Sequence, residues 1–261
     1  MSEVQETLRI AIVQSKLIWE DRSKNRSIFE DQILSISKDV DVIVLPEMFS
    51  TGFTMNTSCA ETMDGESIQW MRKMADKKNA VICGSLIIGE DARYYNRLIW
   101  MPPEGELSYY DKRHLFSYAN EDQYFAAGTQ QKIINYFGWR INLNICYDLR
   151  FPVSLRNVNS YDCLLFVANW PHKRALHWKT LLRARAIENL TYVVACNRVG
   201  EDDNDLMYSG DSTVLGPDGI SLVTESEEST ILIAELSKST LDDYRKTFAF
   251  EKDADTFEIK S

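Results

Sequence analysis

Three apolar stretches rich in β-branched residues constrain the fold of this chain more than any other feature. They are residues 40–46, 163–168 and 192–196. Short, nearly continuous apolar runs of this kind are typical of strands whose two faces are both buried. Segments with apolar residues at helical spacing lie among them, at residues 25–37, 66–78 and 177–190. This alternation predicts an α/β fold with helices outside its sheets.

Shorter runs complete the set of expected elements. Further strands are expected at residues 8–14, 80–88, 95–101, 107–111, 132–137, 140–145 and 230–236. Pro103-Glu-Gly105 predicts a hairpin turn, and residues 213–219 predict another hairpin that residues 230–236 complete. A short helix is expected at residues 153–158. In the helix at 177–190 the side chains expected to face inward are Leu181, Leu182, Ala186 and Ile187. These elements predict one domain with two sheets packed face to face.

The composition argues against several classes of function. The chain has 261 residues and a formal net charge of −10. A spread-out acidic surface repels phosphate groups, so nucleic acids and anionic membranes are not expected partners. The first residues do not resemble a signal peptide, and no apolar run approaches the roughly 20 residues of a membrane helix. The five cysteines are widely spaced and no histidine has metal-ligand spacing, so a cytoplasmic protein without metal or cofactor is expected.

One predicted strand ends at a cysteine. In Arg140-Ile-Asn-Leu-Asn-Ile-Cys146 apolar residues alternate with asparagines, and Pro152 begins a new segment. Ligands of open α/β sheets bind outside the carboxyl ends of the strands, where a thiol near backbone N–H groups can act as a nucleophile. The alternative is that Cys146 only fills space in the core. A papain-like pair with His114 or His172 is a further alternative, although the flanking sequences of such proteases are absent.

Two charged residues also stand where an expected strand ends. Glu47 directly follows the apolar run at 40–46, and Lys112 follows the strand at 107–111. A carboxylate, an amine and a thiol are therefore candidates to converge at one edge of the sheets. The alternative for each charged residue is plain solvation, which is the usual state of surface Glu and Lys side chains.

Six motifs follow one another along the chain. They are Leu-Pro-Glu47-Met-Phe, Asp-Lys112-Arg-His-Leu-Phe, Asn-Ile-Cys146-Tyr-Asp-Leu-Arg-Phe-Pro, Ala-Asn-Trp-Pro171, Leu-Arg-Ala-Arg-Ala-Ile-Glu188-Asn and Ala-Cys-Asn-Arg-Val-Gly200. Together they resemble the nitrilase superfamily of carbon–nitrogen hydrolases, over residues 8 to about 236. The resemblance implies a four-layer α-β-β-α sandwich that dimerises through helices. It also implies a Glu–Lys–Cys triad, which matches Glu47, Lys112 and Cys146.

The same resemblance implies roles for individual residues. Cys146 would form a thioester with the acyl group, and Glu47 would act as the base. Lys112 and the backbone N–H of Tyr147 would stabilise the oxyanion. Lys112 is also expected to favour the thiolate form of the cysteine. A second glutamate that often assists such triads matches Glu121.

Finer details are most similar to the omega-amidase branch, which acts on 2-oxoglutaramate. Val153 stands where many relatives have a glutamate. A substrate carboxylate requires a cation, for which Arg150 is a candidate, although an ion pair of Arg150 with Glu188 or Asp148 is the slightly favoured alternative. Candidates for the wall of the substrate pocket are Phe116, Tyr147 and Trp170.

The resulting expectation is a thiol amidase that uses water and a small omega-amide, as a homodimer or larger homo-oligomer. The polar tail at residues 237–261 is expected at the subunit interface. One rival is a different amidase of the same superfamily, acting on a carbamoyl compound or another small amide. The other is a catalytically silent fold that serves as an oligomeric binding module.

Overall fold

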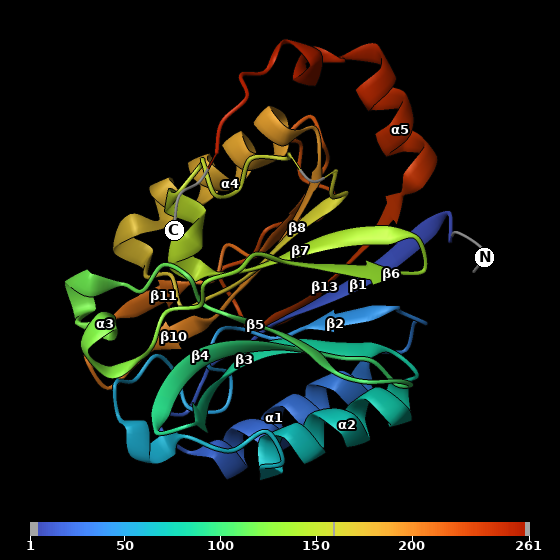
Figure 1. The fold of residues 1–261 in the computed structure, drawn as a ribbon. Helices are drawn as coiled ribbons and strands as arrows, with labels where there is room; N and C mark the ends of the chain where they lie inside the picture. The colour runs from blue at the N-terminus through green and yellow to red at the C-terminus, as the bar shows by residue number, and fades with distance from the viewer. Residues whose placement is uncertain (1–4, 159, 259–261) are drawn as a thin grey trace.

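The computed structural model describes residues 5–158 and 160–258. Two sheets pack face to face, and helices cover their outer faces (Figure 1). The first sheet contains, in spatial order, β13 (Thr230–Ser237), β1 (Thr7–Gln14), β2 (Val42–Val44), β3 (Val81–Glu90), β4 (Arg93–Met101) and β5 (Ser108–Asp111). The second contains β12 (Thr213–Leu215), β9 (Tyr192–Asn197), β8 (Cys163–Ala168), β7 (Trp139–Ile145) and β6 (Lys132–Tyr136). A separate pair consists of β10 (Val199–Glu201) and β11 (Met207–Ser209).

The centre of each sheet is parallel. Strand β2 pairs in parallel with β1 and β3, and β8 pairs in parallel with β7 and β9. Parallel neighbours end at the same edge of a sheet, so the residues after β2 and after β7 emerge toward one end of the molecule. The predicted end-of-strand positions of Glu47 and Cys146 follow from this arrangement.

Alternation along the strands divides the core into layers. In β1, Ile10 and Ile12 face the second sheet, whereas Ala11 and Val13 face helices α1 (Arg22–Ser35) and α2 (Glu66–Lys78). This is the period of two that a pleated strand imposes. On the other side of the molecule, α4 (Ala175–Asn189) packs its buried Leu182 against the outer face of the second sheet. The predicted four-layer α-β-β-α sandwich is confirmed.

Three of the sequence predictions are wrong. Residues 153–158 form the end of a turn and then irregular backbone instead of a helix, with Leu155 N–H donating to Pro152 O at 3.1 Å. Ile187 is exposed, because it lies about 100° around α4 from the buried Ala186. The hairpin expected from residues 213–219 and 230–236 does not form. Its two strands belong to different sheets, since β12 pairs with β9 and β13 pairs with β1.

Two helical segments complete the chain. The short helix expected within residues 112–128 is present as α3 (Glu121–Tyr124). In the tail, α5 (Lys238–Thr247) buries Leu241 in the core between the sheets, and Arg245 forms an ion pair with Asp162 at 3.1 Å. This part of the tail therefore packs against its own chain. Among the described residues, no helix is long and apolar enough to cross a membrane.

Candidate active site

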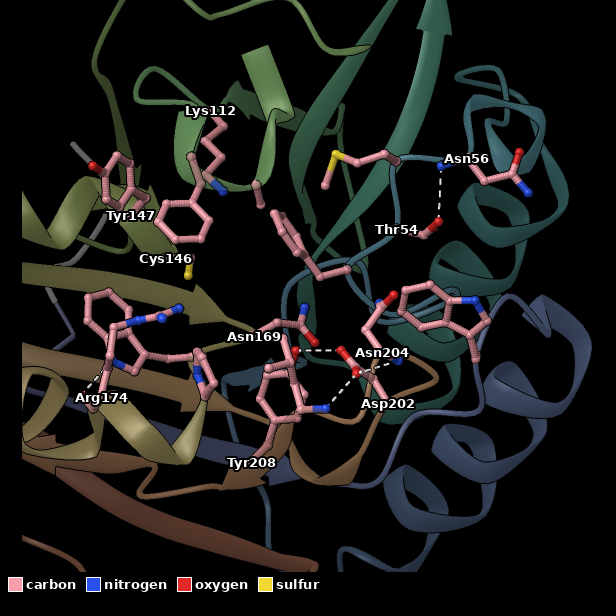
Figure 2. Close-up of a pocket in the computed structure, with 18 of the residues that line it drawn as sticks. Thr54, Asn56, Lys112, Cys146, Tyr147, Asn169, Arg174, Asp202, Asn204 and Tyr208 are labelled. Carbon is pink, nitrogen blue, oxygen red and sulfur yellow. Dashed lines mark hydrogen bonds between the residues drawn. The ribbon is translucent and has the colours of Figure 1, made fainter. Parts of the chain in front are cut away.

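The fold brings four of the candidate residues into one buried cluster. Glu47 follows β2, Lys112 follows β5, Cys146 follows β7, and Glu121 opens α3. The Lys112 ammonium lies 2.8 Å from Glu47 Oε1 and 2.9 Å from Glu121 Oε2, and all three side chains are buried. The thiol of Cys146 lies close enough to Glu47 for the carboxylate charge to act on it. Figure 2 shows the Cys146 sulfur and the Lys112 side chain facing the same cavity.

Further donors hold the two carboxylates. The side-chain amide of Asn96 donates to Glu47 Oε1 at 2.8 Å and to Glu121 Oε1 at 3.2 Å. The backbone N–H of Asn169 donates to Glu47 Oε2 at 2.8 Å, and that of Phe116 donates to Glu121 Oε2 at 2.6 Å. Isolated buried charges are costly, so these contacts are what allows two carboxylates to share one ammonium here.

The turn at Cys146 is held in a sparsely populated backbone conformation. Cys146 has φ +45°, in the left-handed region that few non-glycine residues adopt. The buried Asp148 carboxylate accepts the backbone N–H of Ile145 at 2.9 Å and of His114 at 3.1 Å. It also accepts the hydroxyl of Tyr110 at 2.9 Å. Asp148 thus connects the cysteine turn to the segment that carries Lys112.

Burial and the neighbouring charges raise the pKa of the Cys146 thiol in the resting site. Burial raises the pKa of Cys146 well above that of a free thiol, and the negative charges of Glu47 and Glu121 add to the effect, while Lys112 opposes it. Burial likewise raises the pKa of Glu121. For Lys112, burial disfavours the ammonium, but Glu121 and Glu47 outweigh burial and raise its pKa. Lys112 thus favours the thiolate as expected, but burial and the two carboxylates outweigh it in the resting site.

A cavity of about 390 Å³ opens over the thiol. Its wall includes all the pocket residues expected from the sequence, namely Phe116, Tyr147, Arg150 and Trp170. Arg150 lies over the Trp170 ring at 4.7 Å and contacts His177 Nδ1 at 3.2 Å. The alternative ion pairs of Arg150 do not form, since Glu188 pairs with Arg185 and the Asp148 oxygens accept the donors described above.

Four residues of the site were not predicted from the sequence. Asn96 and Asn169 hold the carboxylates, and Arg174 and Asp202 line the cavity. Asn96 stands beside Arg97 in a strand that begins with Arg93, so the sequence pattern of β4 does not single it out. Arg174 and Asp202 come from turns, and nothing in the sequence pattern near them indicates a site.

The histidines do not support a Cys–His pair. The Nδ1 atom of His114 lies 2.7 Å from Asp148 Oδ1, and its ring stacks on Phe151. His172 is exposed in a short turn of 3₁₀ helix before α4. Neither side chain lines the cavity that contains the thiol. Within the described residues, no group of three His, Cys, Asp or Glu side chains is arranged to hold a metal ion.

A four-layer sandwich with a Glu–Lys–Cys cluster at its strand ends is the arrangement that the sequence resemblance implied. The family model for carbon-nitrogen hydrolase matches residues 9–246, and the chain belongs to this family. It is therefore a hydrolase that acts on carbon–nitrogen bonds of amides.

Individual relatives cover nearly the whole chain. It is 44% identical over 253 residues to the omega-amidase YafV of Escherichia coli strain K12, covering 97% of this chain and 98% of the relative. It is 35% identical over 234 residues to the 2-oxoglutaramate amidase of Bacillus subtilis strain 168, covering 87% and 90%. Its fold matches the crystal structure of XC1258 from Xanthomonas campestris, a CN-hydrolase superfamily protein with an arsenic adduct in the active site. The TM-score is 0.95 at 42% identity, over 98% of this chain and all of that one.

Proposed function

We propose that the protein hydrolyses the terminal amide of a small omega-amide, of the succinamate or 2-oxoglutaramate type, to the acid and ammonia. The observation that carries the proposal is a pair of arginines in the wall of the cavity beside Cys146. Arg150 and Arg174 are close enough for each charge to act on the other, and neither forms an ion pair with a described residue. The names of the relatives in E. coli and B. subtilis support the same substrate class.

The two arginines suit a substrate with a carboxylate at one end. Burial lowers the pKa of Arg150, and the charge of Arg174 lowers it further. A bound carboxylate relieves both effects, since it adds a negative charge between two positive ones. Guanidinium groups also bind carboxylates in a bidentate manner, which fixes the orientation of the substrate. The amide at the other end of the molecule then lies at the thiol.

In the first half-reaction Glu47 acts as the base. Transfer of the thiol proton to Glu47 neutralises the carboxylate that disfavours the thiolate, and leaves the sulfur facing the Lys112 ammonium. The sulfur attacks the amide carbon, and Lys112 with the backbone N–H of Tyr147 stabilises the oxyanion. One such donor typically lowers the barrier by about 3–4 kcal/mol. Glu47 then gives its proton to the nitrogen, and ammonia departs as the C–N bond breaks.

In the second half-reaction water replaces ammonia. Glu47 takes a proton from the water as its oxygen attacks the thioester carbon, and the C–S bond breaks to release the acid. The thiol regains the proton from Glu47. Glu121 and Asn96 act through Lys112 and Glu47, because their hydrogen bonds fix the positions of the ammonium and the carboxylate.

The experiment is ammonia release from succinamate and 2-oxoglutaramate, with a nitrile and a carbamoyl amine beside them. Cys146→Ala is the control. Release from the two omega-amides that disappears in Cys146→Ala is the expected result. Release of ammonia only from the carbamoyl compound would show that the protein belongs to another class of amidase. No release from any compound by the folded protein would favour the binding module.

We also propose that the protein is a cytoplasmic homodimer, formed from single-domain subunits over residues 1–261. Exposed apolar side chains on and beside α4 support association through this helix: Leu176, Ile187 and Ile220. The five unpaired cysteines suit a reducing compartment. Sedimentation equilibrium tests the oligomeric state, and Leu176→Asp is expected to shift it toward the monomer. The interface role of residues 237–261 stays a prediction that a truncation after α5 tests.

A further inference from the structure

The cavity extends to both sides of Cys146. Figure 2 shows Arg174 on one side and Asp202 on the other, with Asn169 between them. We call the second part the Asp202 lobe, and its lining residues in Figure 2 are Thr54, Asn56, Asp202 and Asn204. The full volume, about 390 Å³, lies within the range of sites for drug-sized ligands, roughly 300–1,000 Å³. A small omega-amide with its carboxylate at the arginines leaves the Asp202 lobe free.

Asn169 marks the side on which the leaving group departs. Its backbone N–H binds Glu47 Oε2 at 2.8 Å, and its side-chain amide donates to the Glu47 carbonyl at 2.6 Å. The Asn169 side-chain oxygen is buried, and no described residue donates to it. An unpaired buried acceptor is costly, so a ligand N–H placed there gains a full hydrogen bond. Because Glu47 must protonate the leaving nitrogen, that nitrogen lies beside Asn169.

Beyond Asn169 stands a fixed negative charge. Asp202 is buried at 7% exposure and accepts the backbone N–H groups of Asn204 at 2.9 Å and Leu206 at 3.1 Å. Its second oxygen accepts the Tyr208 hydroxyl at 2.8 Å. The nearby Arg198 lies over the Tyr208 ring and donates to backbone carbonyls instead of Asp202. Asp202 therefore faces the cavity without an ion-pair partner among the described residues.

We propose that the Asp202 lobe is a leaving-group subsite for N-substituted omega-amides whose amine carries a second, positively charged amino group. The proposal rests on the proposed function, because it places the acyl end of the substrate at the arginines. N-(3-aminopropyl)succinamate is a substrate of this class. The carbonyl end reaches Cys146, the amide N–H reaches the Asn169 oxygen, and the terminal ammonium reaches Asp202.

The chemistry is unchanged except for the leaving group. Cys146 sulfur forms a bond to the amide carbon, the C–N bond breaks, and Glu47 transfers the former thiol proton to the departing nitrogen. The products of this step are the succinyl thioester and 1,3-diaminopropane. Water then hydrolyses the thioester to succinate, with Glu47 passing one water proton to the sulfur. No oxidant or further reactant is required.

The experiment compares two secondary amides of nearly equal shape. N-(3-aminopropyl)succinamate and N-butylsuccinamate differ in one terminal group, and succinate release measures kcat/KM for both, with succinamate as the reference. The wild-type protein is expected to have a kcat/KM roughly tenfold higher for the charged amide, because one hydrogen bond to a charged group is worth about that factor. Asp202→Asn is expected to reduce this ratio to about one, because it retains an acceptor oxygen but removes the charge.

Tyr208→Phe is the matched variant. It removes one hydrogen bond to Asp202 but keeps the carboxylate charge, so the ratio between the two amides is expected to persist. Hydrolysis of succinamate alone, with neither secondary amide cleaved, overturns the leaving-group subsite. Equal cleavage of both secondary amides by the wild-type protein overturns the charge recognition. Failure to cleave succinamate itself is a different result, which contradicts the proposed function instead.

Discussion

Replacement of Glu121 by glutamine tests whether the second carboxylate works by holding Lys112. Four hydrogen bonds converge on Glu121, from Lys112 Nζ to both of its oxygens, from Asn96 and from the backbone of Phe116. Every one of these neighbours is a donor. The new amide nitrogen must therefore face another donor in a buried site, with no acceptor to satisfy it.

The size of the effect follows from these contacts. A hydrogen bond to a charged group contributes about 1.5–3 kcal/mol, and an unsatisfied buried donor costs about 1–3 kcal/mol. We expect Glu121→Gln to lower the free energy of unfolding by about 3 kcal/mol. Misplacement of an oxyanion donor lowers kcat by about 10²–10³, so a fall of about 100-fold is expected. KM is expected to change little, because Glu121 does not line the cavity.

The assay is urea unfolding followed by steady-state ammonia release from succinamate. Asp162→Asn is the matched control, since Asp162 is also buried and binds two cations, Lys238 at 2.7 Å and Arg245 at 3.1 Å. It directly precedes β8, whereas the cluster follows the ends of strands. The control is expected to lose stability and keep kcat. A normal kcat in Glu121→Gln would refute the reasoning, and so would an equal loss of kcat in the control.

Three further perturbations have defined outcomes. Arg174→Gln is expected to raise KM for succinamate by about tenfold. KM for butyramide, which has no carboxylate, is expected to stay unchanged, and equal effects on both amides would contradict a carboxylate site. Because burial raises the pKa of Cys146, iodoacetamide is expected to alkylate it more slowly than free cysteine near pH 7. The alkylation rate is expected to be still rising at about pH 9. A rate that reaches its plateau at acidic pH would show a preformed thiolate. Gly128→Ala places a Cβ against the Asp111 carbonyl oxygen, closer than a carbon atom can approach, so a loss of about 2 kcal/mol is expected in thermal unfolding. An unchanged melting temperature would show that the backbone moves aside without cost.

The residues at strand ends were predictable because strand periodicity carries that information. The runs before Glu47 and Cys146 end where the sheets end, and both side chains reach the site as expected. The helix at 66–78 was predicted with its observed bounds, since its apolar stripe is continuous. The hairpin assigned to residues 213–236 failed because local turn signals do not tell which sheet receives each strand.

The rest of the site depends on contacts between distant segments. Asn96 looked like an ordinary strand residue, and only the pairing of β4 with β3 and β5 brings it between the carboxylates. Arg174 stands in a turn of 3₁₀ helix before α4, and Asp202 lies in the connection between β10 and β11. The state of the resting thiol has a related cause. The sequence identified Lys112 and both glutamates as its neighbours, but the burial that outweighs the effect of Lys112 follows only from the fold.

The measurement that tests the central claim most directly is the intact mass of the protein during turnover. Succinamate is mixed with the enzyme, the reaction is quenched in acid within its first turnovers, and the mass spectrum is recorded with a peptide map. A mass increase of one succinyl group on Cys146, removed by hydroxylamine and absent in Cys146→Ala, is the expected result. Steady ammonia release without any acyl group on Cys146, under conditions where ammonia appears in a burst, would contradict the thioester mechanism.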